Sequence, residues 1–215
     1  MLRKAREFYQ HGPNFLISYF ILPIMWFSNK HLILGSKSPR RAHLLREAGF
    51  SFVIRTKDVE ESYPDSLPPE EVATFLAQKK ALAMLEFLES EGDILLTADS
   101  IVLLDDEIFG KPTDREDAAR ILRRLSGNRH RVITGVCLRS SKKELLFAGE
   151  SVVYFEALSE EEITYYIDHF QPYDKAGAYA IQEWIGLCKI SKIEGTYANI
   201  MGLPVDMVYD RLKEF

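Results

Sequence analysis

Cysteine is scarce in this sequence. Only two of the 215 residues are cysteines, Cys137 and Cys188, and both stand in apolar surroundings without a histidine or a second cysteine at metal-ligand spacing. This excludes a disulfide scaffold and a cysteine-based metal site. We predict that both are core thiols of a protein from a reducing compartment, which favours a cytoplasmic location.

An excess of basic residues is also lacking. The chain has 27 Lys and Arg against 32 Asp and Glu, which gives a formal net charge of −5. Domains that bind nucleic acid usually carry a basic balance, so no nucleic-acid partner is expected. Internal repeats and low-complexity linkers are absent, and 47% of the residues are hydrophobic, so the chain can build a single domain around one sizeable core.

Long hydrophobic runs are missing too, with one partial exception near the start. A basic beginning is followed by a mostly apolar segment at residues 15–27, which Pro23 interrupts. The segment is shorter than the roughly 20 residues that span a bilayer, and no small-residue cleavage pattern follows it. It is either a signal or anchor, or part of a mis-assigned start with Met25 as the true initiator. We treat residues 1–30 as an N-terminal extension and expect no membrane partner.

Among the features that are present, the stretch from Leu32 to Gly49 predicts a strand, a tight loop and a helix. Ser38 is a typical N-cap, Pro39 suits the first helical position, and Gly49 can end the helix. A helix N-terminus attracts anions. Two hydroxyl groups and three basic side chains converge on this one: Ser36, Ser38, Lys37, Arg40 and Arg41.

We interpret this loop as an anion site, most simply a phosphate site. It is not a Walker A loop, because the second glycine and the Gly-Lys-Ser/Thr ending are missing. The alternative is an ordinary capped helix with solvated arginines. That reading is weaker, because Arg40 and Arg41 in the first turn oppose the helix dipole and call for an anion in return.

A buried strand is predicted at Asp93–Val102, a nearly continuous apolar run with Asp99 in its middle. A charge in a buried strand is costly unless it is paired, binds a metal or takes part in catalysis. The alternative is an aspartate that caps the next turn. Apolar neighbours on both sides favour a functional role for Asp99.

The remaining elements follow from caps and periodicity. A long helix is predicted over Pro69–Glu89, with Lys79 on its apolar stripe and Lys80 beside it, so periodicity alone leaves open which lysine faces a cleft. His130 is interpreted as a structural strand residue. The other expected elements are a strand at Phe50–Ile54, a helix at Asp114–Leu125, strands at Arg129–Leu138 and Glu144–Glu156, helices at Glu160–Phe170 and Val205–Leu212, and a loop at Ile193–Pro204.

Taken together and in order, these motifs resemble the Maf family of nucleotide pyrophosphatases over about residues 32–215, so we assign residues 31–215 to a Maf-like domain. The matching parts are S-x-S-x-R-R at Ser36–Arg41, the acidic loop ending at Glu61, Lys80, T-A-D-S-I-V, G-K-P at Gly110–Pro112, S-G-x-x-H-x-V-x-T-G-V at Ser126–Val136, D-K-A-G-A-Y-A-I-Q and G-T-Y-A-N-I-M-G-L-P.

The resemblance implies an α/β fold, a mixed β-sheet flanked by helices with two lobes around a nucleotide cleft, like that of Ham1 or ITPase proteins. It also implies hydrolysis of nucleoside triphosphates to the monophosphate and diphosphate with a divalent metal, Mg²⁺ or Mn²⁺, and a homodimer is an expected assembly. Carried over by position, Asp99, Glu61 and Lys80 are the catalytic residues, with Glu61 and Asp99 also at the metal. The substrate-binding residues are Ser36, Ser38, Arg40, Arg41, Lys111 and, on the base side, Gln182.

Within the family, this chain resembles the branch that acts on dTTP and UTP, which carries A-D-T-I-V and D-K-A-G-A-Y-G-I-Q. It departs from that branch at Ser100, which keeps the hydroxyl group, and at Ala180 and Glu183-Trp184, which replace glycines near the expected base pocket. The resemblance also selects Lys80 over Lys79. Whether Asp99 acts as a general base or as a metal ligand is left open.

Overall fold

The structure is a computed structural model that describes residue 27 and residues 29–215, so most of the N-terminal extension lies outside the described residues. Within these residues, no helix has the length and apolar content that crossing a bilayer requires. The elements in chain order are β1 (His31–Leu34), α1 (Pro39–Glu47), β2 (Phe52–Ile54), a 3-10 turn (Pro69–Glu71), α2 (Val72–Ala83), a 3-10 turn (Leu85–Phe87), β3 (Asp93–Leu104), β4 (Glu107–Phe109), α3 (Arg115–Leu125), β5 (Arg129–Arg139), β6 (Glu144–Phe155), α4 (Glu160–Phe170), 3-10 turns (Pro172–Asp174 and Ala176–Ala178), α5 (Trp184–Cys188), β7 (Ile190–Glu194), α6 (Tyr197–Met201) and α7 (Val205–Leu212).

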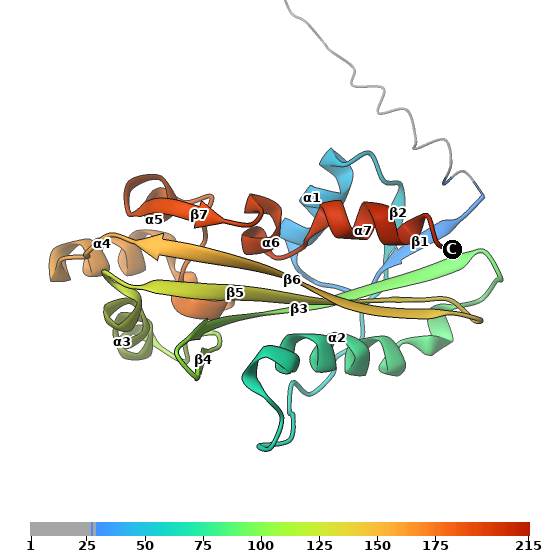
Figure 1. Ribbon diagram of the computed structural model, residues 1–215, viewed down its shortest axis with the longest axis horizontal. Coiled ribbons are helices and arrows are strands. Elements are labelled where there is room, and N and C mark those ends of the chain that lie inside the picture. Colours follow the sequence, from blue (N-terminus) through green and yellow to red (C-terminus); the bar gives the residue numbers. More distant parts are fainter. Residues whose placement is uncertain (1–26, 28) are drawn as a thin grey trace, which may run out of the picture.

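A mixed sheet forms the centre of the molecule, as predicted. In the described part of the chain it has seven strands in the order β2-β1-β3-β5-β6-β7, with β4 also paired to β3. β1 is parallel to β2 and β3, whereas the pairs among β3, β5, β6 and β7 are antiparallel. The long strands β3, β5 and β6 run the length of the molecule and connect its two ends (Figure 1).

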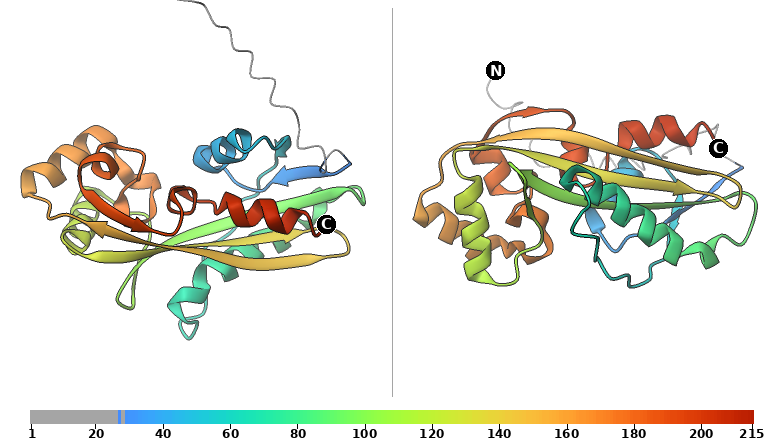
Figure 2. Two further views of the ribbon diagram at one scale, coloured as in Figure 1. Left: turned by 45° about the horizontal axis from the view of Figure 1, so that its top comes forward. Right: turned by 60° about the horizontal axis from the view of Figure 1, so that its bottom comes forward.

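Helices cover the sheet differently at its two ends. At one end, α2 lies on one face of the long strands while α1 and α7 lie on the other (Figures 1 and 2). At the opposite end, α3, α4 and α5 gather around a separate apolar cluster that includes Tyr166, Phe109 and Leu122. The cores under α1 and α7 and under α2 are distinct clusters. The two ends therefore form two lobes that share the three long strands.

Local signals explain most element boundaries. Ser38 caps α1 and Asp114 caps α3, each through a side chain that accepts a hydrogen bond from a backbone N–H of the first turn. Ser159 and Glu162 form the predicted capping box of α4. Gly49 adopts φ 82°, in the left-handed region that ends a helix. His130 is buried and its Nε2 lies 2.8 Å from the Tyr179 hydroxyl, in agreement with a structural role.

Three predictions were wrong in detail. The helix predicted over 69–89 is interrupted, because Met84 leaves helical geometry and Leu85–Phe87 form a 3-10 turn although their apolar pattern continues. The loop predicted at 193–204 contains the end of β7 and all of α6, since β7 is a largely exposed edge strand without apolar alternation. Cys137 is buried as predicted, but Cys188 is exposed at the end of α5.

Close packing of α2 on β5 depends on Gly135, which lies directly opposite Asp99 in the strand register. A Cβ atom at this position would lie 2.3 Å from the Ala73 carbonyl carbon and the Thr74 nitrogen of α2. Backbone atoms of a helix cannot yield to such a contact without shifting the whole helix. The position therefore sets how near α2, and with it Lys80, comes to the sheet.

Replacing Gly135 by alanine should lower the free energy of unfolding by about 3 kcal/mol, because overpacking forces backbone shifts. Urea denaturation measures the change. Gly110→Ala is the matched control: a Cβ there meets nothing within 4 Å, so the loss should stay below about 0.5 kcal/mol. Equal stabilities of the two variants would contradict this account of α2 packing.

Candidate active site

A cleft opens where β3 loses one of its neighbours. β1 pairs with β3 only as far as Leu96, and β4 begins to pair with it at Val102; among the described strands, β5 alone pairs with the segment between. The opening belongs to a cleft of about 660 Å³. All the site residues predicted from the sequence line it: Ser36, Ser38, Arg40, Arg41, Glu61, Lys80, Asp99, Lys111 and Gln182.

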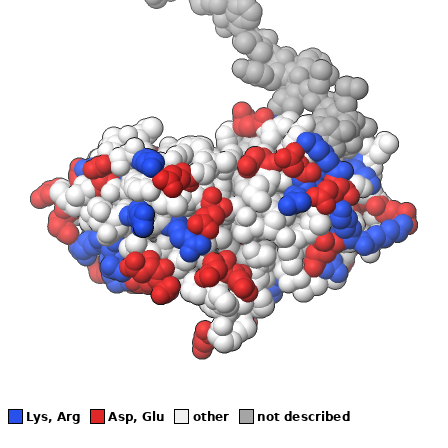
Figure 3. Space-filling view, viewed as in Figure 1, with Lys and Arg blue, Asp and Glu red and all other residues white. Residues whose placement is uncertain are grey.

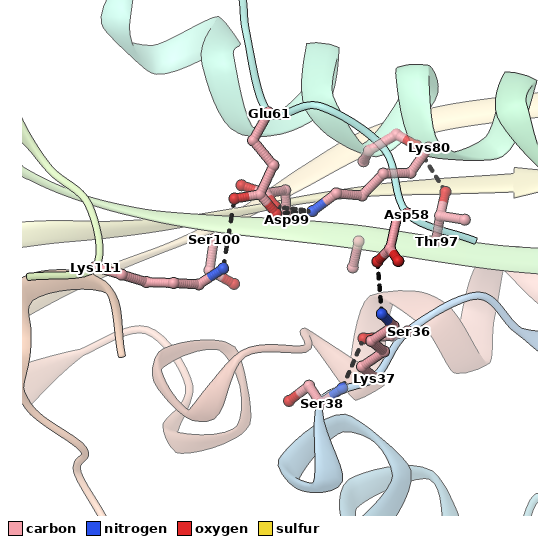
Figure 4. Close-up of polar contacts among 12 residues, drawn as sticks. Ser36, Lys37, Ser38, Asp58, Glu61, Lys80, Thr97, Asp99, Ser100 and Lys111 are labelled. Carbon is pink, nitrogen blue, oxygen red and sulfur yellow. Dashed lines mark hydrogen bonds and ion pairs between the residues drawn. The ribbon is translucent and has the colours of Figure 1, made fainter. Parts of the chain in front are cut away.

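Asp99 and Lys80 meet because of strand and helix periodicity. Alternate residues of β3 face α2, and Thr97 donates a hydrogen bond of 2.7 Å to the Ala77 carbonyl of that helix. Lys80 follows Ala77 by about one helical turn, so its ammonium group reaches Asp99 and donates a short hydrogen bond to its carboxylate (Figure 4). The side chains are only 14% and 13% exposed, so each supplies the charged partner that burial of the other requires.

The two neighbouring lysines of α2 have different surroundings. Lys79 donates hydrogen bonds to the carbonyl oxygen and the hydroxyl of Ser62, at 2.8 and 2.9 Å. Lys80 lines the cleft. The structure thus resolves the alternative that periodicity left open and agrees with the position that the resemblance selected.

Glu61 lies between two ammonium groups. Its carboxylate accepts hydrogen bonds from Lys80 at 2.7 Å and from Lys111 at 3.4 Å (Figure 4). Partial burial acts to raise the pKa of Glu61, but hydrogen bonds and charge from Lys80 and Lys111 outweigh it and hold the pKa below its ordinary value. Glu61 is therefore ionised at neutral pH and joins the acidic loop to both walls of the cleft.

The carboxylates of Glu61 and Asp99 are the type of ligand that hard divalent metals prefer. Among the described residues, no group of three or more His, Cys, Asp and Glu side chains could hold a metal ion by itself. Glu61 and Asp99 do converge on one cation, the Lys80 ammonium. Mg²⁺ is usually bound by one or two carboxylates together with phosphate oxygens, and Mn²⁺ prefers the same oxygen ligands. The donor set thus suits a metal that arrives with a phosphate-bearing ligand.

The loop after β1 and the start of α1 carry the residues of the predicted anion site. The Ser36 hydroxyl accepts a hydrogen bond from the Ser38 backbone N–H at 3.2 Å, and the Lys37 ammonium lies 2.5 Å from the Asp58 carboxylate. Arg40 donates to Asp174 at 2.9 Å, across the cleft from α1 to the other lobe. Burial acts to raise the pKa of Asp174, but Lys175 and Arg40 outweigh it and lower that pKa.

Arg41 has surroundings unlike those of Arg40. Its guanidinium donates to the Gly202 carbonyl (2.8 Å), the Ala98 carbonyl (2.8 Å), the Ser100 hydroxyl (3.0 Å) and the Ser36 hydroxyl (3.3 Å). Burial lowers the pKa of Arg41, opposed by the charge of Asp99. Arg40 thus has a carboxylate partner, whereas the hydrogen-bond partners of Arg41 among the described residues are neutral oxygens.

Gln182 and Ala180 line the end of the cleft that belongs to the second lobe. The Gln182 side chain makes no hydrogen bond to any described residue and the residue is exposed. Glu183 and Trp184 do not line the cleft: the Glu183 carboxylate accepts a hydrogen bond from the Tyr166 hydroxyl at 2.5 Å, and Trp184 packs against Tyr165. These bulkier residues therefore leave the predicted base pocket open.

Sequence reasoning missed two acidic members of the cleft, Asp58 and Asp174. Both stand in segments that attracted attention, the acidic loop and the D-K-A-G-A-Y-A-I-Q segment, but nothing in sequence spacing pairs Asp58 with Lys37 or Asp174 with Arg40. The face in Figure 3 carries acidic and basic side chains interspersed. The pairs inside the cleft could be found only from the fold.

Comparison with known proteins finds relatives over most of this chain. A family model described as "Maf-like protein" matches residues 31–215. A dTTP/UTP pyrophosphatase of Bacteroides fragilis is 47% identical over 184 residues, covering 85% of this chain and 95% of that protein. Proteins of the same name from Porphyromonas gingivalis and Flavobacterium johnsoniae are 47% and 45% identical, covering 86% and 84% of this chain and 94% and 93% of those proteins.

Among solved structures, the Ham1 protein of Staphylococcus aureus aligns with a TM-score of 0.41 at 14% identity, covering 59% of this chain and 72% of that one. The sequence relationships extend over nearly the whole described chain and include every residue of the cleft named above. This chain belongs to the Maf family.

Proposed function

We propose that this protein hydrolyses dTTP and UTP to the nucleoside monophosphate and diphosphate. The observation that carries the proposal is the cleft itself, in which the paired Asp99 and Lys80 stand among further cations that a triphosphate requires. Relatives at 45–47% identity, covering 84% or more of this chain, carry the name dTTP/UTP pyrophosphatase. The name shared by these relatives supports both the proposed hydrolysis and the proposed substrates.

In the proposed reaction, water attacks the α-phosphorus and the bond to the bridging oxygen breaks, so the diphosphate leaves with that oxygen. Asp99 acts in this step either as the general base that accepts a proton from the attacking water or as a metal ligand, and Lys80 holds the Asp99 carboxylate in place. Asp99 is itself only 13% exposed, and its neighbour Ala98 in β3 is buried. Lys80 and Glu61, which also contact each other, complete the catalytic group.

Binding of the triphosphate proceeds by exchange of partners. Three cations of the cleft each contact a carboxylate: Lys37 contacts Asp58, Arg40 contacts Asp174, and Lys111 contacts Glu61. The phosphate oxygens replace these carboxylates as hydrogen-bond partners of the cations. Several charged phosphate oxygens in a partly enclosed site are stronger acceptors than one exposed carboxylate. The hydroxyls of Ser36 and Ser38 at the start of α1 add neutral donors to the same end of the cleft.

A divalent cation, Mg²⁺ or Mn²⁺, is the cofactor we propose, with Glu61 and Asp99 as its protein ligands. When bound, it supplies charge neutralisation on the phosphate oxygens that the lysines and arginines only partly provide. With a metal bound, Asp99 is either the general base or a metal ligand. Replacing Asp99 removes the carboxylate that both roles need.

Turnover of a nucleoside triphosphate panel with Mg²⁺ or Mn²⁺, followed as diphosphate release, tests the function. We expect dTTP and UTP to be hydrolysed, and Asp99→Asn to reduce kcat at least about 100-fold, because a positioned base contributes that much to proton transfer. Absence of diphosphate from every nucleotide would instead indicate a regulatory protein that only binds nucleotide, for example one that acts on septum formation through a partner.

The two lysines of α2 provide a matched pair. Lys80→Met should reduce kcat/KM about 100-fold, because it leaves Asp99 and Glu61 without their shared cation. Lys79→Met removes an equal charge one residue away, but among the described residues the Lys79 ammonium donates only to Ser62, so kcat/KM should change less than about threefold. A larger loss in the Lys79 variant would show that the catalytic assignment is wrong by one residue.

Base preference tests Gln182. An amide offers a donor and an acceptor side by side, which matches the imide N–H and carbonyl of uracil and thymine, whereas cytosine reverses part of that pattern. Gln182→Ala should therefore lower the ratio of kcat/KM for UTP over CTP about tenfold. A change of less than about threefold, or a methylated guanosine triphosphate as the best substrate, would refute the base assignment while leaving the pyrophosphatase activity intact.

A further inference from the structure

We propose that Arg41 is a positioning residue: its guanidinium replaces the missing strand neighbour of β3 and fixes the segment that carries Asp99, and it does not grip the triphosphate. The resemblance to the family implies a phosphate contact for Arg41, so this assigns it a different task. The catalytic consequence rests on the proposed pyrophosphatase function; the structural part stands on the hydrogen bonds alone.

The first step concerns the open edge of β3. Carbonyl groups that point to one edge of a strand belong to alternate residues. On the edge that faces β1, the Leu96 carbonyl accepts from the N–H of Gly35, the residue directly after β1, at 2.8 Å. The next carbonyl on that edge, Ala98, accepts from Arg41 at 2.8 Å. The guanidinium thus continues the ladder at the point where the neighbouring strand stops.

The second step is that Arg41 holds both residues that flank Asp99. It donates to the carbonyl of Ala98 and to the hydroxyl of Ser100, and Ser100 in turn lies 2.9 Å from the Thr134 hydroxyl on β5. Because side chains alternate along a strand, Asp99 points to the opposite face, toward Lys80. Fixing residues 98 and 100 therefore fixes the direction of the Asp99 carboxylate without touching it.

The third step is the number of donors left over. A guanidinium has five N–H groups, and four hydrogen bonds to described residues engage all three nitrogen atoms of Arg41. No free pair of N–H groups remains for the bidentate grip by which guanidinium recognises phosphate. Among the described residues, the Arg40 guanidinium in the same helical turn donates only to the Asp174 carboxylate, and that contact can be exchanged for phosphate.

A direct test is backbone amide exchange in the protein without nucleotide, comparing Arg41→Gln with the matched variant Arg40→Gln. We expect Arg41→Gln to speed exchange at residues 97–101 at least tenfold more than at residues 93–96 of the same strand, which β1 still covers. Arg40→Gln should leave both segments unchanged. Equal acceleration along the whole strand, or none, would overturn the proposal whatever the enzyme does.

Kinetics with UTP test the catalytic consequence. Arg41→Gln should lower kcat about 100-fold while KM stays within about threefold, whereas Arg40→Gln should raise KM more than tenfold. Arg41→Lys keeps the charge but lacks the planar fork, so it should not restore kcat. A raised KM with normal kcat in the Arg41 variants, or full activity of Arg41→Lys, would show that Arg41 binds phosphate. Lack of turnover by the wild-type protein would refute the proposed function and leave the exchange result to decide the structural role.

Discussion

The structure depends on an interruption in its sheet. Between Leu96 and Val102, β3 is paired with β5 but has no described strand on its other edge, because β1 has ended and β4 has not begun. Backbone groups on an open edge inside a protein need partners. Arg41 supplies one of these partners, and the space left by the absent strand becomes the cleft. The same interruption thus creates the site and calls for the residue that stabilises it.

Charge in the cleft is balanced locally. Lys37, Arg40 and Lys111 each lie against a carboxylate, and Lys80 lies against two. Exposed pairs of this kind add little to stability, since solvent screens them. Their value is that several cations stay close together without repelling one another strongly. Asp99 and Lys80 differ from the rest because both are largely buried, so loss of either leaves an uncompensated charge.

Predictions from the sequence were most accurate where a residue type has one common local role. The caps at Ser38, Asp114 and Ser159 marked three helices correctly, and the isolated charge of Asp99 in an apolar strand marked a residue that lines the cleft. It failed where tertiary packing decides: α2 ends at Ala83 despite a continuing apolar pattern, and the edge strand β7 has no alternation to detect. The pairing of Arg40 with Asp174 joins segments 134 residues apart, which no local pattern encodes.

Arg40 and Arg41 show that residue type alone does not determine which groups a side chain contacts. Both stand in the first turn of α1, and from the sequence both suit an anion. A helix turns by about 100° per residue, so neighbours point in different directions. Arg40 thereby meets the carboxylate of Asp174 at the cleft, while Arg41 meets the β3 edge and the Gly202 carbonyl. The two arginines of the S-x-S-x-R-R motif therefore have different neighbours although they are adjacent in sequence. Gly202, which accepts from Arg41, directly follows α6, and α6 is held to β5 because the Asn199 side chain donates to the Val132 carbonyl.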